Sequence, residues 1–216
     1  MRIGILFDLD GTLLNTLDDL TDAVNYAMAQ FGCPARTPRD VRSFLGNGAK
    51  QLIALSLPEY MQPQVDAVLD VYRNYYNAHC QIKTGPYAGI PEALKKLGEK
   101  YPLAVVSNKP DSATKPLIAQ YFPGIYALGE RADCPRKPAP DMLKRAMADI
   151  GVEACVYVGD SEVDVLTARN TGVPCVAVSW GFRDRDVLEE SHPAFICDDP
   201  ANLVEMIEKA AESIEA

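Results

Sequence analysis

The sequence predicts an α/β fold in which a doubly wound, Rossmann-like parallel sheet forms the core and a helical insert follows the first strand. Three observations support this prediction. Short, continuous apolar runs recur along the chain, segments of helical spacing separate them, and one long stretch near the start has helical spacing alone. Continuous apolar runs are typical of strands buried on both faces, and alternation of strands with helices is typical of a parallel sheet.

The predicted strands begin with Ile3-Gly4-Ile5-Leu6-Phe7, an apolar run without polar alternation. Three later runs have the same character, and two more are weaker. The strong runs span residues 103–106, 154–158 and 175–178, and the weaker ones span residues 125–128 and 194–197. Strands of this kind need helices over both faces of the sheet.

The segments between these runs carry the signals that start and stop helices. Pro91 stands at the first position of one predicted helix, and Gly172 ends another. Pro116 falls inside a third, where it removes a backbone hydrogen bond and is expected to kink the helix. The predicted helices of the core cover residues 91–100, 110–122, 140–150, 162–171 and 201–214.

Residues 15–84 are predicted to form an α-helical cap domain, inserted into a core made of residues 1–14 and 85–216. No convincing strand pattern interrupts this insert. Apolar residues at helical spacing mark two of its helices: Leu17, Leu20, Val24, Ala27, Met28 and Phe31, then Val65, Val68, Leu69, Tyr72 and Tyr76.

Local signals subdivide the cap further. Thr16 is the expected N-cap of the first cap helix, with Asp19 three residues later. Thr37 before Pro38 repeats this start signal, and Gly46-Asn47-Gly48 then interrupts the helical pattern. The cap is therefore expected to contain several helices of different length.

Composition narrows the function classes. The 216 residues include 30 acidic and 21 basic ones, so the formal charge is 21 − 30 = −9, which disfavours nucleic-acid partners. The chain lacks both a secretory leader pattern and an apolar run of roughly 20 residues, so we expect no membrane partner and a cytoplasmic location. Six scattered cysteines are expected to be reduced thiols. The chain is expected to be a monomer or a homodimer.

Polar side chains follow the predicted strands where their carboxyl ends meet at one edge of the sheet. Asp8 and Asp10 follow the first strand, Ser107-Asn108-Lys109 follows the second, Lys137 lies beyond a weaker one, and Asp160 follows the run at 154–158. Three carboxylates at one edge need a cation, and oxygen ligands favour Mg²⁺ beside a phosphate. Two isolated histidines make a histidine-based metal site or a Ser-His-Asp triad improbable.

Together these residues make the chain resemble a haloacid dehalogenase-like hydrolase, over essentially its whole length. The four motifs of that superfamily occur in order, each behind a predicted strand: Asp8-x-Asp10-Gly11-Thr12, Ser107, Lys137 and Gly159-Asp160-x-x-x-Asp164. The helical insert resembles the α-helical cap of the first type. Gly46-Asn47-Gly48-Ala49 and Pro86-Tyr87-Ala88-Gly89 further resemble the phosphoglycolate phosphatase branch, whereas Glu162-Val163 stands where that branch often has Arg-Asn.

The resemblance implies a role for each motif. Asp8 would be the nucleophile that forms an aspartyl-phosphate, and Asp10 would be the general acid and base. The metal ligands would be Asp8, the backbone carbonyl of Asp10, and Asp160, while Asp164 would orient them.

The resemblance also implies that four residues form the phosphate-binding part of the site. Ser107 and Asn108 would donate to its oxygens, Lys137 would neutralise its charge, and Thr12 would help to hold the loop. The implied reaction is Mg²⁺-dependent hydrolysis of a small phosphorylated metabolite, phosphoglycolate being the best guess.

Other interpretations remain open from the sequence alone. Asp160 is also a possible N-cap of the helix near Glu162, and Trp180-Gly181-Phe182-Arg183 is interpreted as packing plus a charge at the rim. A phosphomutase of the same superfamily would hand the phosphoryl group to a sugar. A phospho-acceptor signalling domain without turnover and a non-catalytic binding domain are the alternatives of other classes. A dehalogenase is disfavoured because it needs no acid at Asp10.

Overall fold

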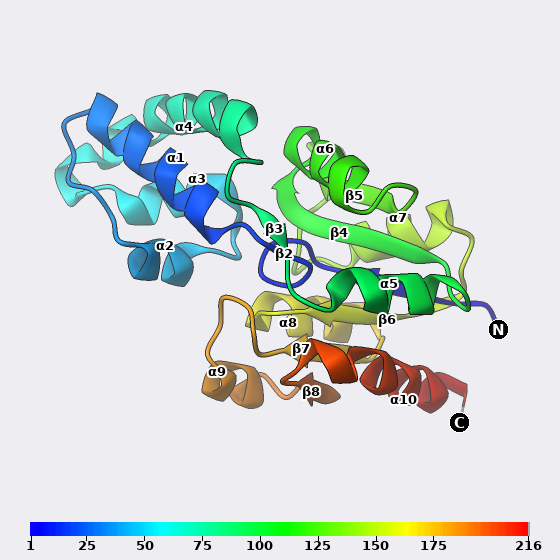
Figure 1. Ribbon diagram of the computed structural model, residues 1–216. Coiled ribbons are helices and arrows are strands. Elements are labelled where there is room, and N and C mark those ends of the chain that lie inside the picture. Colours follow the sequence, from blue (N-terminus) through cyan, green and yellow to red (C-terminus); the bar gives the residue numbers. More distant parts are fainter. Residues whose placement is uncertain (216) are drawn as a thin grey trace. The chain divides into compact units, whose positions relative to one another are not determined.

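The computed structural model describes residues 1–215, which divide into two compact units (Figure 1). The core unit contains Met1–Leu14 and the chain from Pro86 onward, and the cap unit contains Asn15–Gly85. The predicted insert, residues 15–84, therefore differs from the observed cap unit by one residue at the return.

A six-stranded parallel sheet, built from the described residues, organises the core unit. Across the sheet the strands follow the order β5 (Tyr126–Glu130), β4 (Leu103–Pro110), β1 (Ile3–Phe7), β6 (Ala154–Gly159), β7 (Cys175–Val178) and β8 (Phe195–Cys197). The chain adds β4 and β5 on one side of β1 and the other three strands on the opposite side. The predicted α/β fold with a doubly wound sheet is confirmed, and the strand order reverses at β1, where such folds bind their ligands.

The continuous apolar character of β1 follows from burial on both faces. Ile5 and Phe7 lie in one hydrophobic core, and Leu6 lies in the other. Because successive side chains of a strand point to opposite faces, a strand between two cores needs an apolar residue at every position.

Helices cover both faces of the sheet. One core contains buried residues of α5 (Ile90–Gly98), α6 (Asp111–Tyr121) and α10 (Leu203–Glu215), and the other contains those of α7 (Asp141–Asp149), α8 (Glu162–Thr171) and α9 (Arg185–Glu190). A short 3₁₀ helix, η2 (Pro200–Asn202), precedes α10. Helix α6 continues past Pro116, and the kink expected at this residue stays a prediction.

The cap unit is helical, as its periodicity predicts. Its elements are α1 (Leu17–Gln30), α2 (Pro38–Phe44), α3 (Gly48–Ser56), the 3₁₀ helix η1 (Glu59–Gln64) and α4 (Val65–His79). Of the predicted apolar positions, Leu17, Phe31 and Val65 at the helix ends are only half-buried. The remaining predicted positions on α1 and α4 are buried: Leu20, Val24, Ala27, Met28, Val68, Leu69, Tyr72 and Tyr76.

One helix start was predicted correctly and another was not. Thr37 and Asp40 form a reciprocal capping box at the start of α2. Thr16 makes no side-chain cap, and its buried hydroxyl oxygen has no hydrogen-bond partner among the described residues. Its φ of −107° and ψ of 2° differ from the extended conformation that points a cap side chain back at the helix.

Asp19 instead serves the return of the chain. Its buried carboxylate accepts backbone hydrogen bonds from Ile82 at 3.1 Å, Lys83 at 3.0 Å and Thr84 at 2.9 Å. Just beyond, the two connections pair as a short sheet of β2 (Leu14–Asn15) and β3 (Gly85–Pro86). A side chain near the start of α1 therefore holds the end of the cap sequence in place.

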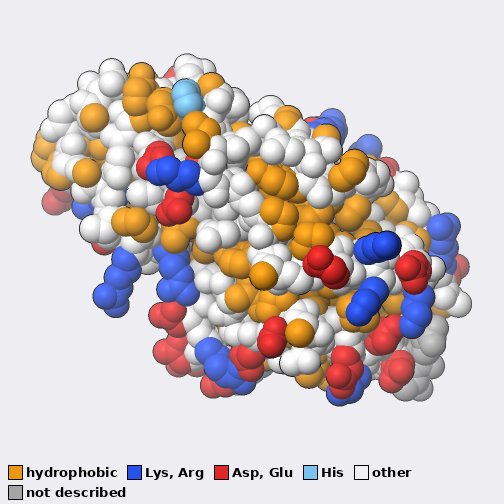
Figure 2. Space-filling model, viewed as in Figure 1, with side chains coloured by type: hydrophobic (Ala, Val, Ile, Leu, Met, Phe, Trp, Pro, Cys, Tyr) orange, Lys and Arg blue, Asp and Glu red, His pale blue; other side chains and the backbone are white. Residues whose placement is uncertain are grey.

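Surface charges on the core unit are mixed in sign. On the face shown in Figure 2, basic and acidic side chains are interspersed around α5 and α10, where Lys100 pairs with Glu208. The six cysteines are free thiols. Among the described residues, none of the helices combines the length and apolar character that a bilayer crossing requires.

Candidate active site

The carboxyl ends of β1, β4 and β6 bring the predicted site residues to one edge of the sheet. Asp8 follows β1, and its backbone N–H donates to the Val158 carbonyl of β6 at 2.8 Å. Asp160 follows β6 directly, and Ser107, Asn108 and Lys109 form the end of β4. The parallel register of neighbouring strands therefore produces the juxtaposition that the motif order predicted.

Asp8 is a buried carboxylate beside a buried lysine. Its side-chain Oδ1 lies 2.8 Å from Lys137 Nζ. Burial raises the pKa of Asp8 to about 6, although the Lys137 charge acts in the opposite direction. Oδ1 receives no directed hydrogen bond from the described residues, so the lysine contact is a charge contact and the oxygen can still serve a cation.

Lys137 contacts three different residues. Its Nζ lies 2.8 Å from Asp8, 2.7 Å from Asp164 and 2.9 Å from the Tyr157 hydroxyl. Burial alone would lower the pKa of Lys137, but the two carboxylates outweigh it and the pKa is raised. The ammonium therefore stays charged at the base of the site.

The Asn108 side chain holds the Lys137 backbone. Its Nδ2 donates to the Lys137 carbonyl at 3.0 Å, and its Oδ1 accepts from the Lys137 N–H at 2.9 Å. The end of β4 is thereby tied to the segment that carries the lysine. This contact shows a positioning role for the Asn108 side chain, and donation from Asn108 to a phosphate stays a prediction.

Asp160 lies between two glycines that leave no room for a side chain. A Cβ at Gly11 would lie 2.2 Å from Asp160 Oδ2, and a Cβ at Gly181 would lie 2.4 Å from the same atom. The backbone N–H of Phe182 donates to Oδ2 at 2.6 Å, and the Thr12 hydroxyl lies 3.5 Å from Oδ1. Burial, followed by the charges of Asp164 and Asp8, raises the pKa of Asp160 well above its usual value.

Both carboxylate oxygens of Asp164 accept hydrogen bonds from neighbouring residues. Its Oδ2 accepts from the Ser161 hydroxyl at 2.6 Å and from the Ser161 backbone N–H at 3.2 Å. Its Oδ1 accepts from Lys137 and, at 3.1 Å, from the Tyr157 hydroxyl. Ser161 is the N-cap of α8, so the alternative interpretation of Asp160 as that cap is wrong.

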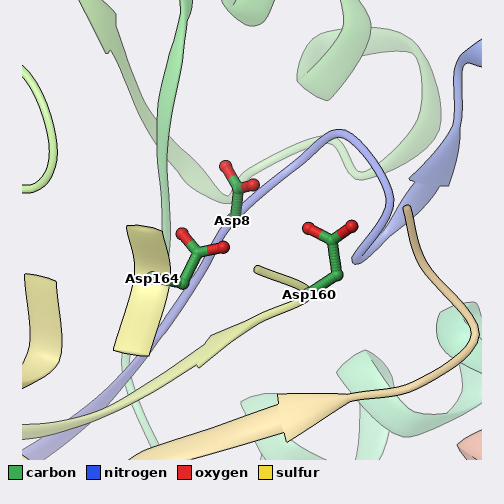
Figure 3. A group of neighbouring side chains, drawn as sticks. All are labelled: Asp8, Asp160 and Asp164. Atoms are coloured by element: carbon green, nitrogen blue, oxygen red, sulfur yellow. The ribbon is translucent and has the colours of Figure 1, made fainter. Parts of the chain in front are cut away.

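These residues fit a hard cation. Oxygens of Asp8, Asp160 and Asp164 lie within 4.8 Å of one another, and the three side chains come from the ends of two neighbouring strands and the first turn of α8 (Figure 3). Three buried carboxylates with one shared lysine leave excess negative charge, which a divalent ion would balance. Asp8 and Asp160 are the better placed ligands because each oxygen of Asp164 already accepts two hydrogen bonds, whereas each oxygen of Asp160 accepts one.

The Asp10 side chain contacts a different lysine from the one that Asp8 contacts. Its Oδ1 and Oδ2 lie 2.9 and 3.1 Å from Lys109 Nζ. The Asp10 side chain is therefore not part of the cluster of carboxylates formed by Asp8, Asp160 and Asp164. Its predicted backbone contact to a metal stays a prediction.

The remaining predicted residues are also placed at this edge. Thr12 and Ser107 are buried, and the Ser107 hydroxyl oxygen accepts from the Lys109 backbone N–H at 3.2 Å. The carbonyl of Thr12 accepts from the indole N–H of Trp180 at 3.1 Å. Phosphate binding by Thr12 and Ser107 stays a prediction.

Three residues that position the site residues were not predicted from the sequence: Tyr157, Trp180 and Phe182. Tyr157 lies inside an apolar strand run, where only its hydroxyl group distinguishes it from an apolar core residue. Phe182 and Trp180 were interpreted as packing, but their N–H groups hold Asp160 and Thr12. Arg183 pairs with Glu162 at 2.7 Å, so the departure at Glu162 is matched by a cation from the next loop. A polar residue at a buried strand position was the only available signal for Tyr157.

Comparisons with known proteins agree with this geometry. Residues 5–178 match the family model described as haloacid dehalogenase-like hydrolase. Phosphoglycolate phosphatase 1 of Pseudomonas aeruginosa is 32% identical over 97% of this chain and 81% of its own length. A phosphoglycolate phosphatase of Haemophilus influenzae is 33% identical over 93% of this chain and 96% of its own length.

Solved structures are also similar to this chain. A crystal structure from Lactobacillus delbrueckii subsp. bulgaricus, described as a candidate phosphoglycolate phosphatase, has a TM-score of 0.88 at 40% identity and covers 94% of this chain and 97% of its own. The chain therefore belongs to the haloacid dehalogenase-like hydrolases. Within that family it is similar to phosphoglycolate phosphatases, which confirms the resemblance drawn from the four motifs.

Proposed function

We propose that this chain is a magnesium-dependent phosphatase that hydrolyses a small phosphomonoester, with phosphoglycolate as the first candidate. The observation that carries the proposal is the approach of Lys137 Nζ to 2.8 Å of Asp8, beside the carboxylate of Asp160. A strand-end carboxylate, a buried cation and a site for a divalent ion are the parts that in-line transfer of a phosphoryl group requires. The names of the relatives support phosphoglycolate as substrate.

The reaction has two steps in this proposal. An oxygen of Asp8 attacks phosphorus, the bond from phosphorus to the ester oxygen breaks, and Asp10 gives that oxygen a proton. Asp10 then takes a proton from water as the water oxygen attacks the aspartyl-phosphate, which releases inorganic phosphate and restores Asp8. Lys137 would stabilise charge on the transferring group, assisted by Ser107, Asn108 and Thr12.

Asp8, Asp160 and the Asp10 carbonyl would hold Mg²⁺, and Asp164 would keep them in place. When bound, the ion would neutralise phosphate charge and align it with the Asp8 oxygen. We also propose a cytoplasmic location, which the six free thiols support.

Replacement of Asp8 tests the proposal. Asp8→Asn should lower kcat for phosphoglycolate with Mg²⁺ by at least about 10³-fold, because an amide cannot form the aspartyl-phosphate. Acid-quenched wild-type enzyme should carry phosphate on Asp8 in a peptide mass spectrum. Asp133→Asn, which alters an exposed carboxylate paired with Arg131, is the matched control and should leave kcat unchanged.

Two results would contradict the proposal. Turnover that persists in Asp8→Asn would remove the nucleophile. Release of less than one phosphate per enzyme without a sugar acceptor would favour a phosphomutase or a phospho-acceptor domain instead.

A further inference from the structure

The loop after β7, residues 179–184, reaches the Asp160 carboxylate through its backbone. The Phe182 N–H donates to Asp160 Oδ2 at 2.6 Å, and a Cβ on Gly181 would lie 2.4 Å from the same atom. Asp160 itself is buried. The position of this loop therefore determines where one of the two oxygens of Asp160 can lie.

An ion pair ties the same loop to the start of α8. The Arg183 guanidinium donates from Nε to Glu162 Oε2 at 2.7 Å and from Nη2 to Glu162 Oε1 at 3.1 Å. Two parallel bonds between a guanidinium and a carboxylate fix the orientation of both groups as well as their distance. The Arg183 side chain is 13% exposed, so water and salt screen this pair less than they screen a pair on the open surface.

The hydrogen bond and the ion pair join the same two stretches of chain. Asp160 and Glu162 are two residues apart on one stretch, and Phe182 and Arg183 are neighbours on the other. Glu162 is the first residue of α8, whose start is fixed by the capping box of Ser161. Because the helix end is fixed, the ion pair holds the loop to it, and the Phe182 N–H is held with the loop.

On the basis of the proposed magnesium-dependent function, we propose that Glu162 and Arg183 are positioning residues for the metal site. Their ion pair keeps the loop against the Asp160 carboxylate and so raises the affinity for Mg²⁺. Hydrogen-bond partners that orient a ligating carboxylate contribute substantially to metal affinity. Loss of the ion pair frees the loop to move, and Asp160 then loses the hydrogen bond that orients it.

The opposite charges of the two residues distinguish positioning from a direct electrostatic effect. If each charge acted only through its field, removal of the Glu162 carboxylate would weaken Mg²⁺ binding and removal of the Arg183 guanidinium would strengthen it. If the pair positions the loop, both removals weaken binding, because either one breaks the same contact.

The experiment measures the Kd for Mg²⁺ by isothermal titration calorimetry, on the full chain without substrate. The proteins are wild type, Glu162→Gln, Arg183→Gln, the double variant with both changes, and Arg183→Lys. Arg131→Gln is the matched control, because Arg131 makes a contact of the same two-bond geometry with Asp133 at an exposed position. Thermal unfolding without Mg²⁺ reports on the fold of each variant.

We expect each single glutamine variant to raise the Kd about five- to tenfold. The double variant should match the single variants within about twofold, because the pair can be lost only once. Arg183→Lys keeps the charge without the two-bond geometry, so its Kd should lie between those of wild type and Arg183→Gln. Arg131→Gln should bind Mg²⁺ as wild type does, and the Tm of every metal-free variant should change little.

Several results would overturn the inference while the proposed function stands. Tighter Mg²⁺ binding in Arg183→Gln would show that Arg183 acts only through its charge. An unchanged Kd in both single variants would show that the pair does not position Asp160, and losses that add in the double variant would show that the two residues act separately. Wild-type protein that binds no Mg²⁺ would refute the proposed metal dependence, and the inference with it.

Discussion

Two glycines determine where the Asp160 carboxylate can lie. Gly11 and Gly181 approach this side chain so closely that a single added carbon on either would overlap its oxygen. Gly11 also has a φ of +83°, a conformation that other residues adopt at a cost of about 1–2 kcal/mol. Gly11 belongs to a motif that is visible in the sequence, but its close approach to Asp160 exists only in the folded chain.

Gly11→Ala should weaken Mg²⁺ binding more than it weakens the fold. The added Cβ would lie 2.2 Å from Asp160 Oδ2 and should displace the carboxylate, which we expect to lower Mg²⁺ affinity at least tenfold. Isothermal titration calorimetry measures the affinity, and thermal unfolding measures the stability.

Gly124→Ala separates backbone strain from displacement of the carboxylate. Gly124 has a φ of +92°, and an added Cβ there would have no neighbour within 4 Å. Gly124→Ala should lose about as much stability from backbone strain as Gly11→Ala does, but it should keep the wild-type affinity for Mg²⁺. Equal loss of affinity in both variants would show that the space beside Asp160 is unimportant.

At the scale of elements, Asp19 links the start of α1 to the return segment at residues 82–84. Three backbone N–H groups share one buried carboxylate, so these residues are held without belonging to a helix or a strand. Charge-assisted bonds of this kind are stronger than bonds between neutral groups. The cap sequence is thereby closed on itself before the chain returns to the core unit.

Asp19→Asn should loosen the return segment. An amide has one accepting oxygen where the carboxylate has two, and its NH₂ group would face backbone donors, so the cap should lose about 1.5–3 kcal/mol of stability. Hydrogen exchange at residues 82–84 should accelerate. Asp22→Asn is the control, because Asp22 pairs with Lys83 at an exposed position and should change exchange little. Unchanged exchange in Asp19→Asn would show that these bonds do not hold the segment.

For the whole molecule, the site is a concentrated negative charge inside an acidic protein. Asp8, Asp10, Asp160 and Asp164 meet Lys109 and Lys137, so the formal balance with all groups ionised is 2 − 4 = −2. Burial raises the pKa of Asp8 to about 6 from 3.8. The native state therefore binds this proton more tightly than the unfolded state does.

The sign of the pH dependence follows from that difference. Below about pH 4 the tighter proton binding at Asp8 stabilises the metal-free fold fully, and this contribution, on the order of 3 kcal/mol, is lost as pH rises through about 6. A divalent ion favours the ionised carboxylates, so its stabilising effect should grow over the same range.

Saturating MgCl₂ should therefore raise Tm more at about pH 7.5 than at about pH 5. Differential scanning fluorimetry measures both shifts. Asp8→Asn, which has no proton to release at this position, should show a smaller difference between the two pH values. A Tm shift that is equal at both pH values in wild type would contradict the expected role of Asp8.

The sequence by itself determined the α/β class and the helical insert, and it placed Asp8, Lys137 and Asp160 at one edge of the predicted sheet. It could do so because apolar periodicity and the polar residues at strand ends are local properties of the chain. The tertiary structure alone decided that Tyr157, the Phe182 N–H and Asn108 position these groups, and that Asp19 rather than Thr16 organises the start of the cap. Those contacts join residues far apart in the chain, and a hydrogen bond between distant segments leaves no pattern in either of them.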